Sequence, residues 1–404
     1  MGVWPYLDCD LRLYAVEVLR IVAIPDSFKG SLRAADVAAS LASGARAGAA
    51  QVGVPVDVAA LPFADGGEGA LDAIVDAWGV VVREVATTDA LDRPVVARLG
   101  VSPDGRTAVV EAADANGLPQ VSDVPLEPLR ASTRGLAPLV LAACDAGVEE
   151  IVLFIGGSAT TDGGAGLLVG LGADLLDADG HAVAAGGGGL LRLDRLDLSG
   201  LDPRVRGLRW RIACDVTNPL TGPRGAAAVF GPQKGADPDQ VRELDAGLAR
   251  LARVLAHETV VDHDDRPGAG AAGGLAAPLV ALFGAELEPG WEVVADAVGA
   301  RELLANADLV LTGEGRLDTQ SLAGKVVSGV RAMTPASVPV VALCGEVAVD
   351  DATLSAAGIT LALSIARGPE TLDELTAGAA ERLADLALGV TRFYLTVTVE
   401  KDIL

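Results

Sequence analysis

The sequence predicts an α/β protein built on a parallel β-sheet, with a second, mixed α/β domain inserted into the first. Two observations support this prediction. Short apolar segments alternate with helical segments at both ends of the chain, in the β-α-β-α order that parallel sheets require. From about residue 80 the pattern changes, and closely spaced alternating segments there favour antiparallel pairing. The two ends are therefore expected to form one discontinuous domain, and the middle to form another.

Composition limits the class of protein. The chain has 404 residues, half of them hydrophobic, which is enough for two or three domains with sizeable cores. No apolar run reaches the length of a membrane span. The net charge of -24 argues against non-specific binding of nucleic acid, because such binding needs basic surface to neutralise phosphates. We therefore expect a soluble globular protein that binds neither membranes nor nucleic acids.

The cysteines and the N-terminus bear on location. Cys9, Cys144, Cys214 and Cys344 lie far apart, so neither a zinc site nor a disulfide framework is indicated. The first twenty residues lack a basic segment followed by an apolar one, and so do not resemble a secretory signal. Both observations favour the cytoplasm. A monomer and a homodimer are equally compatible with the sequence.

The two ends of the chain share one rhythm of strands and helices. In the first part, strands are expected over residues 18–25 and 56–61, with helices from 31 onward and over 70–78. In the last part, the expected elements are a strand over 307–311, a helix through 325–333, and strands over 339–344 and 359–364. We assign residues 19–85 and 286–390 to the discontinuous parallel-sheet domain.

The middle of the chain is assigned to the inserted domain, residues 86–285. Short strands are expected over 80–85, 95–99 and 107–112, followed by a helix over 136–146 and a strand over 151–155. Residues 1–18 are predicted to be an N-terminal extension and residues 391–404 an atypical C-terminal tail, because all three tyrosines lie in the two ends of the chain. The active site is expected in the cleft between the domains.

The most informative turn is the glycine-rich loop 156–164. It follows the apolar strand 151–155 and leads into a helix, so its backbone can come close to an anion at the helix N-terminus. Ser158, Thr160 and Thr161 add hydroxyl donors, and Asp162 adds a carboxylate that could hold Mg2+ or take a proton. The alternative is a buried turn whose glycines only permit tight packing.

Similar polar turns recur along the chain, several of them directly after apolar strands. They comprise residues 25–30, 65–69, 214–219, 231–235 and 312–318. The carboxyl ends of parallel strands meet at one edge of a sheet, and ligands of open α/β sheets bind in the crevice there. The recurrence therefore indicates one shared crevice at the strand ends.

Lysine is scarce and specifically placed. Of 31 basic residues only four are lysine, yet the three internal ones, Lys29, Lys234 and Lys325, each adjoin a glycine in a polar turn or loop. A lysine ammonium binds phosphate as a point charge, whereas arginine prefers bidentate recognition of planar groups. We interpret the three lysines as phosphate ligands; the alternative is three surface lysines placed by chance.

Two common nucleotide-binding motifs are missing or out of context. Residues 323–326 lack both the earlier glycine of a Walker A motif and the hydroxyl residue after its lysine. Residues 268–273 match the dinucleotide-binding fingerprint, but a polar run precedes them in place of the required strand. A phosphotransferase with this sequence would belong to neither the P-loop nor the protein-kinase class.

A set of longer motifs resembles the bacterial type-1 glycerate kinase family. In chain order they read PDSFKGSL, PFADGGEG, GGSATTDGGAG, ACDVTNPLTGPRGAAAVFGPQKGA, GAAGGL and LTGEGRLDTQSLAGK. The resemblance spans residues 18–390 and leaves both termini outside it. It implies ATP-dependent phosphorylation of D-glycerate with Mg2+, at the 2-hydroxyl. It also implies two α/β domains around the active cleft, one of them Rossmann- or flavodoxin-like.

The basic residues suit this chemistry. Phosphoryl transfer needs positive charge on the transferring group, a metal bridge and a residue that orients the attacking hydroxyl. On this interpretation Lys29, Lys234 and Lys325 neutralise phosphates or the glycerate carboxylate. Arg316 would hold the substrate carboxylate through two hydrogen bonds.

The acidic residues have overlapping candidate roles. Asp162, Asp215 and Glu314 compete for the roles of Mg2+ ligand and base, and with Lys29 and Arg316 they complete the predicted catalytic set. The predicted substrate- and phosphate-binding residues are Asp26, Ser27, Asp65, Gly66, Gly67, Glu68, Gly156, Gly157, Ser158, Thr160, Thr161, Asn218, Lys234, Asp318 and Lys325. Some of these acids are equally good helix caps or turn acceptors, Asp65 and Asp318 above all.

Four alternatives stay open on the sequence. The chain could be a kinase for another small hydroxy acid, or a glycerate 3-kinase. A dinucleotide-dependent oxidoreductase is suggested only by residues 268–273. A non-catalytic anion-binding protein leaves the acids beside the anion site unexplained, since carboxylates repel anions unless a metal intervenes.

Overall fold

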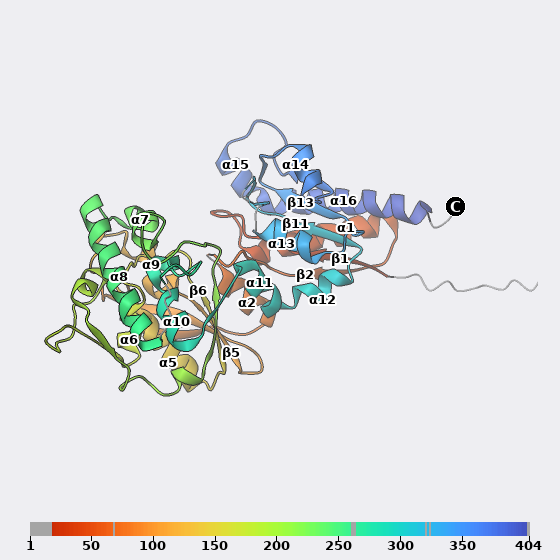
Figure 1. The fold of residues 1–404 in the computed structure, drawn as a ribbon. Coiled ribbons are helices and arrows are strands. Elements are labelled where there is room, and N and C mark those ends of the chain that lie inside the picture. The colour runs from red at the N-terminus through yellow and green to blue at the C-terminus, as the bar shows by residue number, and fades with distance from the viewer. Residues whose placement is uncertain (1–17, 68, 260–263, 320, 323–324, 402–404) are drawn as a thin grey trace, which may run out of the picture.

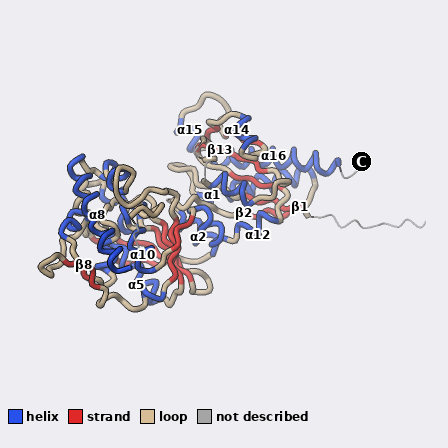
Figure 2. Tube along the Cα trace, viewed as in Figure 1, coloured by secondary structure: helices blue, strands red, loops and turns tan. Residues whose placement is uncertain are grey.

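Two β-sheets form the centres of two lobes, with helices on both sides of each sheet (Figures 1 and 2). The computed structural model describes residues 18–67, 69–259, 264–319, 321–322 and 325–401. The first sheet is entirely parallel, in the order β2-β1-β11-β13-β15. Its strands are β1 (Leu19–Ala23), β2 (Val56–Ala60), β11 (Leu309–Thr312), β13 (Val340–Cys344) and β15 (Leu361–Ser364).

The strand order confirms the predicted fold class. Counted along the chain, the strands of the first sheet lie in the order 2-1-3-4-5, which is the flavodoxin-like order. The order reverses between β1 and β11, and ligands of such sheets bind at the carboxyl ends of the strands beside this switch point. The predicted discontinuity is also present, because β1 pairs with β11, a strand that follows more than two hundred residues later.

The side chains of β1 point alternately to the two faces of the sheet, and helices cover both faces. Ile21 and Ala23 belong to one hydrophobic cluster and Val22 and Ile24 to another, as the two-residue period of a strand requires. The first cluster holds α1 (Ala34–Val52) and α16 (Ala379–Lys401) against the sheet. The helices with residues in the second cluster are α2 (Ala70–Trp78), α11 (Gly290–Val298), α12 (Ala300–Ala305), α13 (Val326–Met333) and α14 (Asp351–Ala356).

The second sheet is mixed, in the order β10-β9-β6-β5-β4-β3. Its strands are β3 (Arg83–Thr88), β4 (Pro94–Val101), β5 (Thr107–Glu111), β6 (Glu150–Phe154), β9 (Arg209–Ala213) and β10 (Glu286–Glu288). The pairs β3-β4 and β4-β5 are antiparallel, as the sequence indicates, and the remaining pairs are parallel. The outer strands β3 and β10 extend past the predicted limits of residues 86–285, and the division into domains stays a prediction.

Helices cover the face of the second sheet that points away from the first lobe. They pack on Leu153, Trp210 and Ile212 within one large hydrophobic cluster. The main ones are α5 (Ala137–Asp145), α6 (Ala165–Gly170), α7 (Ala226–Phe230), α8 (Pro238–Thr259), α9 (Ala271–Gly274) and α10 (Ala276–Phe283). Two short helices, α3 (Ala113–Asn116) and α4 (Leu118–Val121), follow β5.

The two lobes share a hydrophobic layer. Val109, Val152 and Phe154 of the second sheet belong to the same buried cluster as Val22 and Val310 of the first. Helices α2 and α11 lie between the sheets and supply the middle of this layer (Figure 1). The lobes are therefore joined by a continuous core as well as by the chain.

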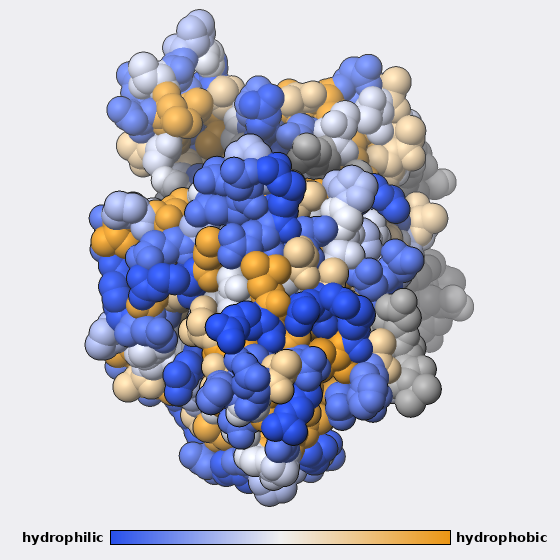
Figure 3. All heavy atoms as spheres, turned by 60° about the vertical axis from the view of Figure 1, so that its left-hand side comes forward, coloured by the Kyte–Doolittle hydropathy of each residue, from blue (hydrophilic) through white to orange (hydrophobic). Residues whose placement is uncertain are grey.

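The C-terminal segment differs from the expected separate tail. Helix α16 continues through residues 391–401, with Leu395 fully buried and the Tyr394 hydroxyl donating to the carbonyl oxygen of Asp308 at 2.9 Å. No local pattern in the sequence indicates this, because α16 docks mainly on α1, which is distant in the chain. The face in Figure 3 is mostly hydrophilic, with hydrophobic residues in small groups. Within the described ranges no helix has the length and apolar character needed to cross a membrane.

Candidate active site

The switch point of the first sheet brings two predicted acids together. Asp26 follows β1, and its backbone N–H donates to the carbonyl oxygen of Gly313 at 2.8 Å. The hydroxyl of Thr312 donates to the carbonyl oxygen of Ile24 at 2.8 Å, so the two strand ends are fixed in register. Glu314 comes directly after this contact. Asp26 and Glu314 therefore lie side by side because β1 and β11 are neighbours.

A cavity of about 480 Å3 opens across these strand ends, and we call it the strand-end cavity. It contains most of the predicted site residues of the first lobe. They are Asp26, Ser27, Lys29, Asp65, Glu314, Arg316, Asp318 and Lys325. Gly345, after β13, and Ile365, after β15, also line it. The turns 25–30 and 312–318 therefore meet at the strand ends with Asp65, whereas the turns 214–219 and 231–235 of the predicted shared crevice do not line this cavity.

The carboxylates of this cavity influence one another. Burial, with the nearby Asp65 carboxylate, raises the pKa of Asp26 to about 6, and its side chain is only 8% exposed. Burial also raises the pKa of Glu314 to about 7, and the charge of Asp26 adds to that shift. The Oε1 atom of Glu314 is buried and has no hydrogen-bond partner among the described residues. Such an oxygen is suited to a cation or a proton.

Three cations stand beside these acids. Lys29 is exposed in the turn after β1, and Lys325 is the N-cap residue of α13. Arg316, in the short strand β12 (Arg316–Leu317), lies 3.4 Å from the carboxylate of Glu346. Because that pair is largely exposed, it is weak and leaves Arg316 able to exchange partners. Positive and negative groups thus share one cavity, as a metal-phosphate site requires.

A second cavity, of about 520 Å3, lies between the lobes, and we call it the interlobe cavity. Gly67 and the turn at Asp26 to Lys29 line it from the first lobe, and Gly156 and Gly157 line it from the second. The turn is therefore a shared wall of the two cavities. Groups bound in the two cavities can therefore meet at this turn.

The interlobe cavity contains a charged cluster that the sequence analysis missed. Arg98 of β4 forms two hydrogen bonds with Asp114, at 2.8 and 3.1 Å, and one with Asp72 of α2 at 2.6 Å. Glu111 lies 3.9 Å from the same guanidinium and accepts from the backbone N–H of Leu71 at 2.9 Å. Burial raises the pKa of Glu111 to about 7. In the sequence, only the position of Glu111 at the end of an apolar strand could have indicated this cluster.

Lys234 does not reach either cavity. Its side chain is 3% exposed, and Nζ donates to the carbonyl oxygen of Thr160 at 2.6 Å and to the hydroxyl of Ser158 at 3.0 Å. Burial lowers its pKa to about 7. The geometry therefore favours a structural cation inside the glycine-rich loop over the predicted contact with phosphate. Thr160 and Thr161 are buried as well, and only Gly156 and Gly157 of the loop face a cavity.

Asp162 is also turned into the core. It is fully buried, and its carboxylate accepts from the backbone N–H groups of Thr133 at 2.8 Å and of Gly164 and Gly166 at 3.1 Å. The Thr133 hydroxyl donates to it at 3.0 Å. Asp162 lines neither cavity, so the structure does not bring it to the other catalytic candidates. The alternative reading of the loop, as a tightly packed turn, describes this half of it better.

Asp215 and Asn218 line neither cavity. Asp215 accepts from the backbone N–H of Gly290 at 2.8 Å, and desolvation raises its pKa. Gly290 in turn packs against Gly66. A Cβ added to Gly66 would lie 2.4 Å from the Cα of Gly290. The Asn218 side chain donates to the carbonyl oxygen of Arg224 at 2.8 Å. Glu68 lies outside the described residues.

The fingerprint at residues 268–273 has a packing function. No strand precedes it within residues 264–267, the described segment before it. An added Cβ at Gly273 would lie 2.0 Å from the carbonyl oxygen of Thr160, so this turn packs directly on the glycine-rich loop. The segment lines neither cavity. These contacts give no support to dinucleotide binding.

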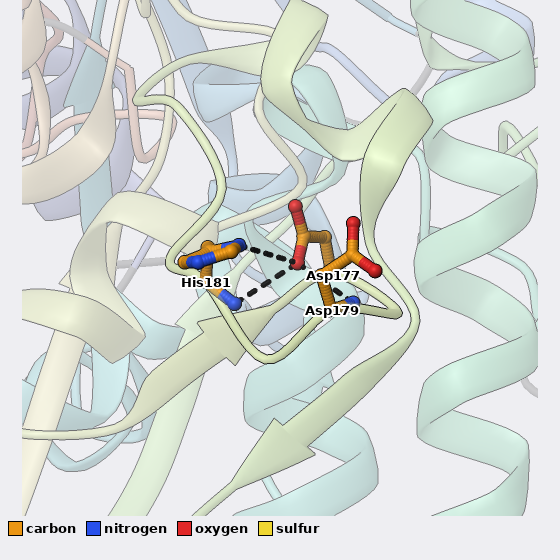
Figure 4. Close-up of side chains that lie close together, drawn as sticks. All are labelled: Asp177, Asp179 and His181. Carbon is orange, nitrogen blue, oxygen red and sulfur yellow. Dashed lines mark hydrogen bonds and ion pairs between the residues drawn. The ribbon is translucent and has the colours of Figure 1, made fainter.

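One compact group of possible metal ligands lies elsewhere, in the turn after β7 (Asp174–Leu176) (Figure 4). Asp177 accepts there from the backbone N–H groups of Asp179 at 3.0 Å and His181 at 2.9 Å, and it pairs with Arg192 at 3.1 Å. Its carboxylate is thus occupied by the turn. Among the described residues, the acids of the strand-end cavity do not form such a tight group.

The fold and the cavities define a two-lobed α/β phosphotransferase, with acids and lysines at the switch point of a parallel sheet. The sequence profile described as "Glycerate kinase family" matches residues 21–395. The chain belongs to the glycerate kinase family.

Curated relatives and a solved structure agree with this assignment. The glycerate 2-kinase of Escherichia coli (strain K12) is 42% identical over 381 residues, covering 92% of this chain and 99% of that protein. The glycerate kinase of Bacillus subtilis (strain 168) is 43% identical, covering 90% and 94%. A crystal structure from Salmonella typhimurium LT2, provisionally named glycerate kinase 2, superposes with a TM-score of 0.85 at 42% identity, covering 96% of this chain and all of that one.

Proposed function

We propose that this enzyme transfers the γ-phosphoryl group of ATP to the 2-hydroxyl of D-glycerate, giving 2-phospho-D-glycerate and ADP. Family membership supports the kinase class, and the name of the Escherichia coli relative supports the 2-position. The observation that carries the proposal is the pairing of acids and lysines along the turn between the two cavities. A cytoplasmic location and a monomeric or dimeric state stay predictions from the sequence.

Lys29 and Lys325 are the groups we assign to the phosphates. Lys29 lies on the wall common to both cavities, where a phosphoryl group must pass from donor to acceptor. Lys325 adds its charge at the start of α13, where the helix dipole also favours an anion. Both stabilise the negative charge that develops on the transferring group. Arg316 lines the strand-end cavity, and its predicted contact with the glycerate carboxylate stays a prediction.

Mg2+ fits the acids of the strand-end cavity. The unpartnered Oε1 of Glu314 and the buried carboxylate of Asp26 are the residues we assign to it. Mg2+ binds through one or two carboxylates, waters and substrate phosphates, so a tight three-carboxylate group is not needed. The ion would supply charge neutralisation between the phosphates. A nearby carboxylate accepts the hydroxyl proton as the new O–P bond forms and the bond from phosphorus to ADP breaks.

The function is tested by product identification. The purified protein is incubated with ATP, Mg2+ and D-glycerate, and 2-phosphoglycerate is detected through enolase without phosphoglycerate mutase. A signal without mutase is the expected result. A signal only with mutase indicates 3-phosphorylation. Absence of ADP formation with glycerate refutes the proposal and directs the search to other hydroxy acids.

A further inference from the structure

We propose that the strand-end cavity, and not the interlobe cavity, binds the nucleoside part of the nucleotide, with the base against an apolar wall at Ile365, Leu372 and Leu375. The phosphates then run toward Lys29, and the acceptor enters from the interlobe cavity. This inference rests on the proposed kinase function and assigns the donor to one of two cavities of similar volume.

The position of the cavity on the sheet is the first argument. Asp26, Glu314, Gly345 and Ile365 follow β1, β11, β13 and β15, so the cavity spans the carboxyl ends of four adjacent strands. Nucleotides in open parallel sheets lie across this edge, beside the switch point. The interlobe cavity touches the first sheet only at the turn after β1 and at the segment after β2.

The apolar wall is the second argument. Leu372 begins α15 (Leu372–Ala377) and is 77% exposed at the cavity, an unusual state for a leucine on a helix. Leu375 lies one turn later, and Ile365 closes the wall from the end of β15. Exposed apolar groups next to a few polar ones are typical of small-molecule sites. A planar base placed there would bury this surface.

The charge distribution is the third argument. The strand-end cavity carries Arg316, Lys325 and Lys29 together with Asp26 and Glu314, the acids assigned to Mg2+, and this combination suits a metal-bound polyphosphate. In the interlobe cavity the guanidinium of Arg98 is already held by Asp72 and Asp114. That wall offers carboxylate oxygens, which accept hydrogen bonds from the hydroxyls of a small acceptor, and Lys29 and Arg33 line the same cavity and can attract the acceptor's carboxylate.

Leu372→Glu tests the assignment, because an exposed side chain can be changed without disturbing the core. We expect the KM for ATP to rise about tenfold, because apolar contact with the base is lost and a negative charge is added beside the nucleotide, and the KM for glycerate to stay within about twofold. Leu303→Glu is the matched control, since Leu303 is a partly exposed leucine of helix α12 that lines neither of the two cavities. Both KM values should be unchanged in the control.

Photolabelling gives an independent readout. With 8-azido-ATP and the wild-type protein, label is expected in the peptide that contains residues 365–379 and not in residues 111–120 of the interlobe cavity. An unchanged KM for ATP in Leu372→Glu, or label confined to residues 111–120, overturns the inference. If the wild type forms no ADP with glycerate, the proposed function fails, whereas the label still decides which cavity binds nucleotide.

Discussion

Among single residues, Lys29 and Lys234 make a pair with opposite expectations. Lys29 is exposed on the wall shared by the cavities, whereas Lys234 is buried in the glycine-rich loop. Lys29→Ala should lower kcat by about 100- to 1000-fold, the loss seen when one group stabilising a transition state is removed. Its stability should change by less than about 0.5 kcal/mol. Arg83→Ala, at an exposed arginine of β3, serves as control and should keep full turnover.

Lys234→Met, in contrast, should mainly lower the stability of the protein. It removes two hydrogen bonds, to Ser158 and Thr160, and a charge that interacts with Asp162. We expect a loss of about 2 to 4 kcal/mol in the free energy of unfolding, measured with urea, because buried polar groups lose their partner. If the variant kept its stability but lost its turnover, the result would support the predicted contact between Lys234 and phosphate.

Glu111 carries a prediction about pH. Its pKa is raised from 4.5 to about 7 in the folded protein by burial, so the native state binds more protons than the unfolded state between these values. The stability contribution of Glu111 therefore falls as pH rises through this window. Glu111→Gln keeps an acceptor for the Leu71 N–H but cannot ionise. Relative to wild type, it should gain about 1 to 3 kcal/mol between about pH 5 and pH 8 in urea titrations. A difference independent of pH would contradict this.

Helix α1 and helix α16 pack backbone to backbone, a contact that no local pattern in the sequence revealed. A Cβ at Gly44 would lie 2.0 Å from the carbonyl oxygen of Ala384, and one at Gly48 would lie 2.5 Å from that of Leu388. The five strands of the first sheet and the helices α1, α2 and α13 were predicted, because each follows from local periodicity and turn residues. Their docking partner was not, since α16 is more than three hundred residues away in the chain.

Two glycine substitutions measure this helix contact. Gly44→Ala should destabilise the protein by about 1 to 3 kcal/mol, because overpacking outweighs the higher helix propensity of alanine. Gly389→Ala, on α16, has no atom within 4 Å of the added Cβ and should be neutral or stabilising by up to about 1 kcal/mol. Thermal unfolding of both variants provides the comparison. Equal effects of the same sign would rule out the packing argument.

The whole molecule is expected to unfold as one unit. The hydrophobic layer between the sheets contains residues of both lobes, so neither lobe keeps its core when the other unfolds. Calorimetry should show one transition, and Ile74→Ala, in the middle layer, should lower its midpoint without splitting it. Two transitions, with only one of them shifted by the variant, would show that the lobes unfold separately.

The sequence by itself determined the parallel-sheet fold, the family motifs and the residues that follow the strands, such as Asp26, Lys29 and Glu314. These depend on local periodicity and on the rule that parallel strands end at one edge. Only the tertiary structure decided which polar loop residues face a cavity. Asp162 and Lys234 turn inward while Arg98, Glu111 and Leu372 line the cavities. The reason is physical: the same polar groups that bind ligands also satisfy buried backbone, and distant packing partners decide between the two.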